Sequence, residues 1–355
     1  MANSITKPEY LAIGVMSGTS LDGLDIALCK FIVNDNKWSF EILKSHTFIY
    51  DSSWKNILAT SDRLEAAELL KLHHQFGEYI GLKVKEFLAD TKSAPDLIAS
   101  HGHTVFHRPD EGITLQIGYG EDIYKETNIP VVTDFRTKDV IYGGQGAPLV
   151  PIGDELLFNQ YDYCLNLGGF SNVSFMHDKN RIAFDICPCN MALNEIASKL
   201  GFTMDRNGEL ARQGKMNNSL FEQLNSIDYY SKPIPKSLGK EWFVREFASV
   251  ISNASISEYD ILRTVTEHIA YQVSITLKGG KTIVTGGGAR NRFLLELLQE
   301  KSESEIILPS VELIDYKEAI IFALLGVLRI RNEINIYSSV TGASKDLCSG
   351  IIFNS

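Results

Sequence analysis

A glycine-rich stretch near the start of the sequence carries several side chains that could hold a phosphate. Residues 14–25 read GVMSGTSLDGLD and include Ser17, Thr19, Ser20 and Asp22. Glycine allows backbone conformations that other residues resist. Bare N–H groups and small hydroxyls suit a phosphate, and a nearby carboxylate can hold its Mg²⁺ through water. The stretch indicates a phosphate-binding turn, with an ordinary polar hairpin turn as the alternative.

Two common nucleotide-binding patterns are missing. The stretch lacks the G-x-x-x-x-G-K-[ST] spacing of a P-loop, and no lysine follows its glycines. No glycine-rich run has the G-x-G-x-x-G spacing after a strand and before a helix, so a dinucleotide-binding fold has little support. Any phosphate site in this chain must therefore use a different turn.

Three histidines follow a short apolar run at residues 97–100. His101, His103 and His107 could suggest a metal site, but they run from a strand into a loop and no carboxylate stands among them. The run predicts a buried strand that leads into a loop. We therefore favour histidines that make hydrogen bonds in a loop over metal ligands.

An acidic and a basic residue follow the predicted strand at residues 129–133. Asp134 and Arg136 come directly after residues 129–133, at the strand end where open α/β sheets place their chemistry. The run at residues 143–148, GGQGAP, comes next. It could be a hinge or a ligand-binding loop, or a plain linker between domains.

A second acidic position stands beside a pair of cysteines. Residues 185–190 read DICPCN, so that Asp185 precedes Cys187 and Cys189. A C-x-C pair could bind metal or become oxidised, but no second Cys or His cluster is close in sequence. Reduced thiols in the core are therefore expected for most of the five cysteines, which are Cys29, Cys164, Cys187, Cys189 and Cys348.

Hydrophobic periodicity predicts a mixed α/β framework that positions these groups. The predicted strands are residues 10–13, 24–31, 38–43, 97–100, 114–118, 129–133, 163–167, 173–176, 181–185, 281–285 and 305–308. The predicted helices are residues 64–88, 191–200, 260–278 and 316–330, with Asp260 as the N-cap of the third. Each half opens with a strand, a glycine turn and a strand. Two similar lobes that grip a nucleotide and close to exclude water from phosphoryl transfer are therefore expected.

The composition limits the class of protein. The chain has 355 residues, 44% of them hydrophobic and 22% charged, with a formal net charge of −10. This length favours two domains, and this composition is typical of a soluble globular protein. Because no basic face stands out, nucleic acid is not an expected partner. The N-terminus has no signal-peptide core and no apolar run could span a membrane, so we expect a cytoplasmic protein without a membrane partner.

Several motifs together resemble a known family. The chain resembles anhydro-N-acetylmuramic acid kinase, of the sugar kinase/Hsp70/actin superfamily, and GVMSGTSLDG with GGQGAPLVP is the most specific part of the match. Matching stretches cover nearly the whole chain in the order of the family. They are residues 14–25, 101–104, 115–118, 130–136, 139–140, 143–151, 166–172, 184–185, 188, 190, 236–237, 239–243, 286–291 and 339–344.

The resemblance implies a fold and a reaction. The expected fold is α/β, a two-lobed actin-like ATPase (ribonuclease H-like) fold with ATP in the interdomain cleft. Using ATP, Mg²⁺ and water, the enzyme would convert 1,6-anhydro-N-acetylmuramic acid to N-acetylmuramic acid 6-phosphate, with release of ADP. This step belongs to peptidoglycan recycling and amino-sugar catabolism. A glycosidase commonly needs two carboxyl groups, but here the γ-phosphoryl group captures O6, so one base aimed at water can suffice.

The resemblance also implies roles for individual residues in binding ATP. The ATP phosphate turn is made by Gly18, Thr19, Ser20, Leu21, Asp22 and Gly23. Asp22 is the candidate for water-mediated contact with Mg²⁺. Gly168 and Gly169 match the second phosphate turn, and Gly286, Gly287 and Gly288 match the adenosine side.

By the same resemblance, Asp185 is the general base, with a helix cap as the alternative role. The expected substrate-binding residues are His101, Arg136, Asn190 and Glu318. Arg136 could bind the lactyl carboxylate of the sugar or a phosphate, or it could brace a hinge. Glu318 could lie near the sugar, or it could be an acid in the first turn of a helix, favoured by the helix dipole.

The expected domains are residues 1–135 and 136–345, with the segment 346–355 returning to the first, and a homodimer is expected. The chain departs from the family pattern F-D-T-G-P-G-N, because Cys187 and Cys189 replace two glycines. His103 replaces a common glutamine, and Asn194 replaces a common aspartate. These changes keep two alternatives open, a kinase of the same fold for another amino or anhydro sugar and a catalytically weak sugar sensor.

Overall fold

Two compact units make up the chain. The computed structural model describes residues 7–18 and 20–354. Unit 1 consists of residues 1–157 and 316–355, and unit 2 of residues 158–315. The expected domain bounds at residues 135 and 345 differ from these unit bounds. The expected domain bounds stay a prediction.

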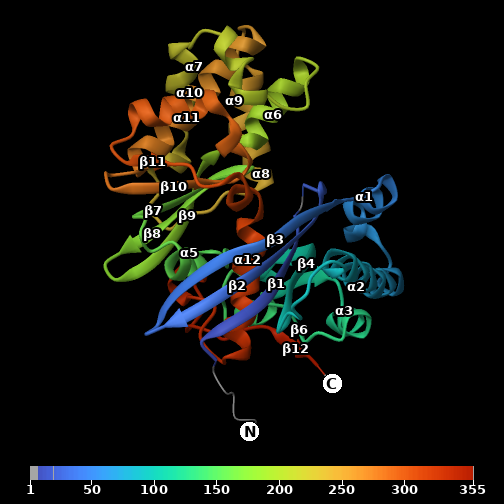
Figure 1. Cartoon of the computed structure of the whole chain (residues 1–355). Coiled ribbons are helices and arrows are strands. Elements are labelled where there is room, and N and C mark those ends of the chain that lie inside the picture. The colour runs from blue at the N-terminus through green and yellow to red at the C-terminus, as the bar shows by residue number, and fades with distance from the viewer. Residues whose placement is uncertain (1–6, 19, 355) are drawn as a thin grey trace. The chain divides into compact units, whose positions relative to one another are not determined.

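The described part of unit 1 contains a seven-stranded sheet in the order β12-β6-β4-β1-β2-β3, with β5 paired to β4 (Figure 1). Strands β1, β2 and β3 form an antiparallel meander, and β4 and β6 run parallel to β1. The strands are β1 (Glu9–Ser17), β2 (Gly23–Asn34), β3 (Lys37–Ile49), β4 (Leu97–Arg108), β5 (Ile113–Ile117), β6 (Val131–Thr133) and β12 (Ile351–Phe353). The helices that lie in this unit are α1 (Ser52–Ala59), α2 (Ala66–Leu88), α3 (Gly120–Thr127), α4 (Thr137–Ile141), α5 (Pro151–Leu157) and α13 (Ser338–Thr341).

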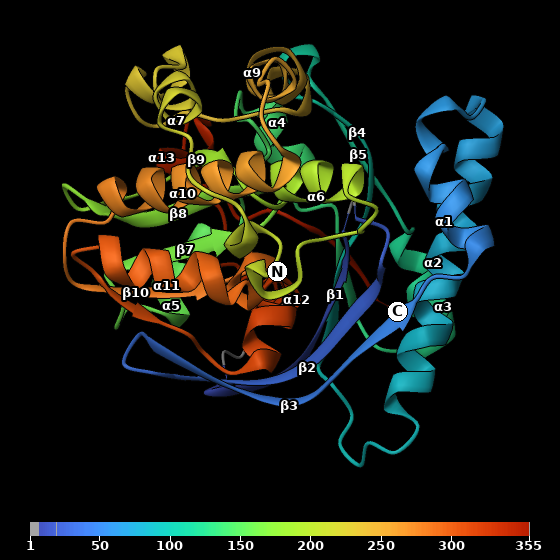
Figure 2. The same cartoon turned by 90° about the horizontal axis from the view of Figure 1, so that it is seen from above.

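Side-chain alternation gives the sheet of unit 1 two covered faces. Ile13 and Ile98 pack in the same core cluster as Phe76 of α2, which buries a face of that helix at helical spacing. Helix α3 lies beside α2 (Figure 2). Gly14 and Ala99 alternate with those residues and meet α12 (Val311–Ile330).

Unit 2 repeats the strand order of unit 1. Its described sheet has the order β11-β10-β7-β8-β9, again an antiparallel meander with two further strands parallel to its first strand. The strands are β7 (Tyr163–Leu167), β8 (Phe170–His177), β9 (Asn180–Pro188), β10 (Lys281–Thr285) and β11 (Glu305–Ile307). The helices are α6 (Asn190–Lys199), α7 (Asn218–Asn225), α8 (Lys240–Trp242), α9 (Ala248–Ser252), α10 (Glu258–Thr276) and α11 (Arg292–Lys301). Helices α6 and α11 both pack against α10.

This repetition confirms the expected α/β class with two similar actin-like (ribonuclease H-like) halves. Residues 163–167, 281–285 and the long helix near residues 66–88 agree closely with the sequence prediction. The location of ATP between the halves stays a prediction.

Three local expectations were wrong. The histidines at 101–107 lie in a strand, because β5 pairs with β4 and extends it to Arg108. The N-cap of α10 is Ser257, whose hydroxyl accepts the N–H of Asp260, so Asp260 lies inside the helix. Helix α12 begins at Val311, so Glu318 is not in its first turn.

Candidate functional site

The turn after β1 is the expected phosphate turn of unit 1. It connects Ser17, the last residue of β1, to Gly23, the first of β2, and the N–H of Leu21 donates to the carbonyl of Gly18 over 3.3 Å. Leu21 has a positive φ of 59°. Ser20 and Asp22 are exposed, whereas Thr19 lies outside the described residues. The exposed side chains leave this turn accessible to an anion and its cation.

Ser17 itself is tied into the interior below the turn. Its hydroxyl accepts a hydrogen bond from the Tyr50 hydroxyl over 2.8 Å and lies 3.1 Å from Nδ1 of His103. Burial lowers the pKa of His103 to about 4, so this imidazole is neutral at pH 7. No pattern in the sequence indicated Tyr50, which directly follows the last residue of β3. We conclude that Ser17 supports the turn from below.

His101 and Arg136 are brought into direct contact. Nδ1 of His101 lies 2.9 Å from the carbonyl of Gly102, so Nδ1 carries the proton and Nε2 is the acceptor. Arg136 Nε donates to that Nε2 over 2.9 Å, and Nη1 donates to the carbonyl of Gly146 over 2.6 Å. Burial lowers the pKa of Arg136 to about 10, opposed by Glu318 and Asp139. Arg136 is thus both a brace and a cation at neutral pH, and these two bonds use two of its five N–H donors.

Asp139 organises the glycine-rich loop after Arg136. Its carboxylate accepts from the N–H of Gly146 over 2.7 Å and from the Thr341 hydroxyl over 2.7 Å. A Cβ at Gly144 would lie 2.1 Å from Oδ2 of Asp139, so glycine is needed there for close packing. The whole run at residues 143–148 lies inside unit 1, so it does not link the two compact units. It packs onto residue 341, which belongs to another of the matching motifs.

Glu318 reaches this region because α12 lies directly on β1. A Cβ at Gly14 would be 1.7 Å from the carbonyl oxygen of Ala319, so only glycine allows this approach. Phe322, one helical turn after Glu318, has its ring 4.8 Å from the ring of His101. The side chain of Glu318 is exposed and acts electrostatically on Arg136. Three of the expected substrate-binding residues therefore lie close together in unit 1. They are His101, Arg136 and Glu318.

Asp185 occupies a distinctive position in unit 2. One carboxylate oxygen, Oδ2, accepts the N–H of Leu238 over 2.9 Å. Burial raises the pKa of Asp185 to about 6, and the Leu238 N–H offsets part of this rise. An acid with this pKa is ionised at pH 7 and can still accept a proton readily. Its main contacts are not those of a helix cap, because α6 begins five residues later.

A β-bulge sets the direction of Asp185. Asn172 of β8 pairs with Asp185, but the preceding Ser171 pairs with Cys187, so Ile186 is the extra residue. Both Cys187 and Cys189 are fully buried. The Sγ of Cys187 lies 3.1 Å from the Ser171 hydroxyl. The two thiols that replace the glycines of the family are therefore directed into the core of unit 2.

The second glycine turn and the later glycine triplet meet around Asn190. The carbonyl of Gly169 accepts the N–H of Cys189 over 2.8 Å and that of Met191 over 3.1 Å, and the carbonyl of Gly168 accepts that of Asn190 over 3.1 Å. The side-chain amide of Asn190 donates to the carbonyl of Leu167 over 2.9 Å. A Cβ at Gly288 would lie 3.3 Å from Oδ1 of Asn190 and 2.7 Å from Cβ of Leu167. Asn190 thus joins the expected second phosphate turn to the expected adenosine side.

The triplet after β10 has a backbone that only glycine adopts easily. Gly286 has a φ of 82°, and a Cβ there would lie 2.4 Å from Oδ1 of Asn166. Gly287 and Gly288 begin a short 3₁₀ turn, Gly287–Arg290, and Asn291 then caps α11. This is a strand-to-helix turn of the kind that lets a nucleotide approach the backbone.

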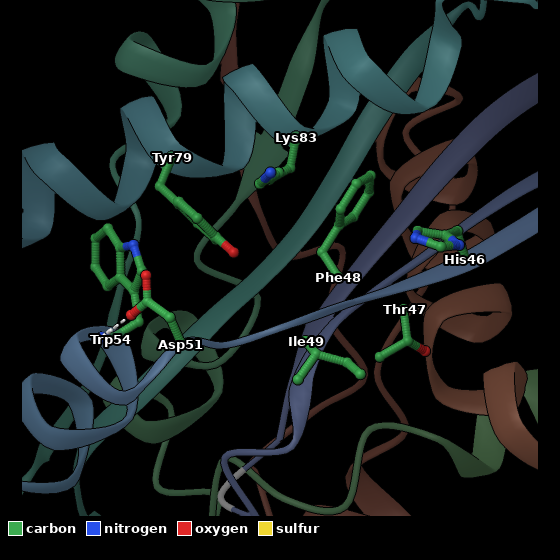
Figure 3. Close-up of a pocket in the computed structure, with 8 residues that line it drawn as sticks. All are labelled: His46, Thr47, Phe48, Ile49, Asp51, Trp54, Tyr79 and Lys83. Atoms are coloured by element: carbon green, nitrogen blue, oxygen red, sulfur yellow. Dashed lines mark hydrogen bonds between the residues drawn. The ribbon is translucent and has the colours of Figure 1, made fainter.

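A pocket of about 420 Å³ lies elsewhere in unit 1 (Figure 3). It is lined by His46, Thr47, Phe48, Ile49, Asp51, Trp54, Tyr79 and Lys83. The rings of Trp54 and Tyr79 are 4.6 Å apart, and Asp51 caps α1. No residue predicted from the sequence lines this pocket. It arises where the end of β3 meets α1 and α2.

The described residues contain neither a preformed metal cluster nor a membrane-spanning helix. No group of three or more His, Cys, Asp or Glu side chains within residues 7–18 and 20–354 is arranged to hold a metal ion. No helix in that part of the chain is both long and apolar enough to cross a membrane. All five cysteines are free thiols, and Cys29, Cys164, Cys187 and Cys189 are buried.

Sequence reasoning missed the residues that hold the expected site residues in place. Leu238 acts through its backbone N–H, which no residue-type pattern reveals. Tyr229 contacts Asp185 from a segment more than forty residues away. Asp139 lies in a matching stretch shortly before the glycine-rich run at residues 143–148, and this placement was a sequence signal that could have found it.

Comparison with known proteins gives a consistent result. A family model described as anhydro-N-acetylmuramic acid kinase matches residues 10–355. A protein of that name from Aliivibrio fischeri is 34% identical over 96% of this chain and 98% of its own length. Another from Caldanaerobacter subterraneus subsp. tengcongensis is 33% identical over 98% of this chain and 97% of its own length.

Among solved structures, component A of the (R)-2-hydroxyglutaryl-CoA dehydratase of Acidaminococcus fermentans is 14% identical with a TM-score of 0.47. The alignment covers 91% of this chain and 99% of that chain. The family match covers nearly all of the chain, and it includes every motif around the glycine turns, Arg136 and Asp185. The chain therefore belongs to the anhydro-N-acetylmuramic acid kinase family.

Proposed function

We propose that this chain is a kinase that uses ATP, Mg²⁺ and water to convert 1,6-anhydro-N-acetylmuramic acid to N-acetylmuramic acid 6-phosphate and ADP. Membership of the family supports the reaction and its place in peptidoglycan recycling and amino-sugar catabolism. We also propose that the protein acts in the cytoplasm as a homodimer.

The observation that carries the proposal is the state of Asp185. This carboxylate is half-buried, is held at Oδ2 by one backbone N–H, and has a pKa raised to about 6. In the proposed reaction it removes a proton from water while the water oxygen bonds to C1 of the sugar. The C1–O6 bond breaks, and O6 bonds to the γ-phosphorus as the bond to the ADP oxygen breaks. The developing charge on O6 thus passes to the phosphoryl group, and one carboxylate is enough.

The other expected site residues take supporting roles in this proposal. Gly18 to Gly23 with Gly168 and Gly169 offer backbone N–H groups to the ATP phosphates, and Asp22 holds Mg²⁺ through water. Gly286, Gly287 and Gly288 adjoin the adenosine. His101, Arg136, Glu318 and Asn190 contact the sugar, with Arg136 supplying the cation for its carboxylate.

The reaction can be tested with isotopically labelled water. We expect that protein, ATP, Mg²⁺ and 1,6-anhydro-N-acetylmuramic acid in ¹⁸O water give a 6-phosphate with ¹⁸O at C1, read before anomeric exchange. Asp185→Asn should reduce the rate by about 10²–10⁴-fold, because the general base is lost. Asp178→Asn is the matched control, because Asp178 is an exposed acid in the β8–β9 hairpin whose positive φ suits asparagine.

Other results would assign a different function. A product formed only from another amino or anhydro sugar would favour a kinase of the same fold with a different substrate. Tight sugar binding without ADP release, unchanged in Asp185→Asn, would favour a sensor. Activity that survives removal of Mg²⁺ by EDTA would contradict the metal requirement, and a monomer mass by light scattering would contradict the homodimer.

A further inference from the structure

Three contacts from one segment converge on Asp185. The hydroxyl of Tyr229 donates to the backbone carbonyl of Asp185 over 2.6 Å. The backbone N–H of Asp185 donates to the carbonyl of Lys236 over 3.0 Å. The N–H of Leu238 donates to the carboxylate. Residues 229–238 therefore hold Asp185 at its N–H, its carbonyl and its side chain.

Tyr229 and Lys236 tie that segment together. The Nζ of Lys236 donates to the carbonyl of Tyr229 over 3.0 Å and to that of Tyr230 over 3.3 Å, and it lies 4.6 Å from the ring centroid of Tyr229. Tyr229 is only 2% exposed. The buried ring of Tyr229 and the hydrogen bond from its hydroxyl to the Asp185 carbonyl connect this residue to the strand that carries the base. Leu238, whose N–H donates to the Asp185 carboxylate, lies two residues after Lys236. The contact between Lys236 and the Tyr229 ring therefore connects this loop to the same ring.

A separate buried chain of hydrogen bonds anchors the short turn Asp228–Ser231 from its other side. The hydroxyl of Tyr230 lies 2.8 Å from Nε2 of His268, whose Nδ1 lies 2.9 Å from Oδ1 of Asn225. Asn225 Nδ2 donates to the carbonyl of Phe221 over 2.8 Å, so its Oδ1 is the acceptor, and His268 carries its proton on Nδ1. Burial lowers the pKa of His268 to about 3, in agreement with a neutral ring. Tyr230 therefore fixes the turn without contact with Asp185.

We propose that Tyr229 is a positioning residue for the base. Its hydroxyl fixes the backbone of Asp185, and its hold on Lys236 keeps the Leu238 N–H on Oδ2, so that Oδ1 is left to accept the proton from water. The inference rests on the proposed role of Asp185 and adds a residue that neither the motifs nor the comparisons assign. A fixed carboxylate matters because small misplacements of reacting groups cost large factors in rate.

The experiment measures the pKa of the Asp185 carboxyl, which reports the position of the base, separately from the catalytic rate. The ¹³C resonance of the Asp185 carboxyl, assigned by its loss in Asp185→Asn, is titrated in the wild type and in Tyr229→Phe. Tyr229 and Cys187 face Asp185, but burial raises the pKa of both groups, so neither titrates between pH 4 and 8. Loss of the Leu238 N–H from the carboxylate should raise the pKa of Asp185, because that bond favours the ionised form.

Tyr229→Phe keeps the ring and the carbonyl that hold Lys236, and it removes only the hydroxyl that holds the carbonyl of Asp185. We expect the carboxylate of Asp185 to shift away from the Leu238 N–H as a result. The titration midpoint should then rise, and kcat should fall about tenfold or more with little change in KM for the sugar. Lys236→Met should shift the midpoint in the same direction. Tyr230→Phe is the matched control. It should lower the melting temperature, because it leaves buried His268 without its donor, and it should leave the midpoint and kcat near those of the wild type.

Failure of the inference and failure of the proposed function give different results. An unchanged midpoint in a folded Tyr229→Phe protein, or an equal fall in kcat in Tyr230→Phe, would overturn the positioning role. If Tyr229→Phe does not fold, an unchanged midpoint in Lys236→Met would overturn it. Full activity in Asp185→Asn would instead reject the proposed function, and the inference would fail with it because no base would be left to position.

Discussion

The two units share one strand order, but Asp185 of unit 2 differs from the buried charged groups of unit 1 in how its charge is balanced. In unit 1, the buried carboxylate of Asp154 lies 2.7 Å from Nζ of Lys317, and Arg136 is balanced by Glu318 and Asp139. In unit 2, the carboxylate of Asp185 receives a backbone N–H, and no cation among the described residues contributes to its pKa. With a pKa lowered only to about 10, Arg136 keeps its positive charge at neutral pH. A carboxylate left without a counter-ion has a pKa close to neutral pH, where proton transfer is efficient.

The difference suggests a division of work within a repeated topology. Unit 1 supplies charges that stay fixed, such as Arg136, and an exposed turn with Ser20 and Asp22. Unit 2 supplies one group that can change its charge, held by a bulge and a backbone donor. Strand order alone decides neither the fixed charge of Arg136 nor the changeable charge of Asp185. Both depend on which groups later segments of the chain bring to the end of each strand.

The largest expected effect concerns the paired charges of unit 1. Lys317→Met should destabilise the protein by about 3–5 kcal/mol, because it leaves Asp154 charged in a buried position. Urea unfolding would measure this loss. The double variant Asp154→Leu/Lys317→Met should recover most of it, since an apolar pair can replace a buried ion pair. A loss below about 1 kcal/mol in the single variant would contradict the distinction between the units.

The second prediction concerns the pH dependence of activity. Asp185 must be ionised to act as a base, so kcat/KM should fall about tenfold per pH unit below pH 6. His101 and His103 should not contribute a limb near pH 6.5, because burial lowers the pKa of both groups. A pH-rate profile checks this expectation. A fall in kcat/KM centred near pH 4 would show that the pKa of Asp185 is that of an ordinary carboxylate.

The third prediction concerns the cost of the isolated charge in unit 2. The pKa of Asp185 is raised from 3.8 to about 6, so ionisation opposes folding, and stability is lost as pH rises from about 4 through 6. Asp185→Asn should therefore stabilise the protein by ~1–3 kcal/mol at pH 8. The gain should vanish near pH 3, where the Asp185 carboxyl of the wild type is mostly neutral in both the folded and the unfolded state.

Melting curves at both pH values measure this gain. Asp154→Asn is the control from unit 1 and should have the opposite sign at pH 8, because it removes the charge of the carboxylate that buried Lys317 contacts. Equal signs for the two variants would remove the contrast between a paired and an isolated carboxylate.

The smallest expected effect concerns the thiols beside the base. Cys187 is fully buried, and burial raises its pKa to about 12, so it should not react with a thiol reagent in the native state. Cys187→Ala should cost about 1 kcal/mol, for a small cavity and a lost contact with Ser171, with little change in kcat. Cys348→Ala, at a half-buried site, is the control and should be within about 0.5 kcal/mol of the wild type. A large loss of activity in Cys187→Ala alone would mean that this thiol faces the substrate.

Most of the framework was predictable because periodicity and glycine turns are local signals. The strand–turn–strand units at residues 10–31 and 163–176 were found from alternation and glycine alone. The extent of β4 was not, because its second half is stabilised by pairing with β5. The start of α12 was also missed, since its first residues carry no strong apolar period.

The sequence by itself determined the α/β class, the glycine turns, and the family through motifs spread along the whole chain. It named Asp185, Arg136 and the glycines as candidates through their match to the motifs of the family, which can be read directly from residue types and their order. Only the tertiary structure decided that Cys187 and Cys189 point into the core, that Arg136 binds His101, and that Asp185 is held by Leu238 and Tyr229. These properties depend on burial and on contacts between distant segments, which set the charge and direction of a side chain and leave no local trace.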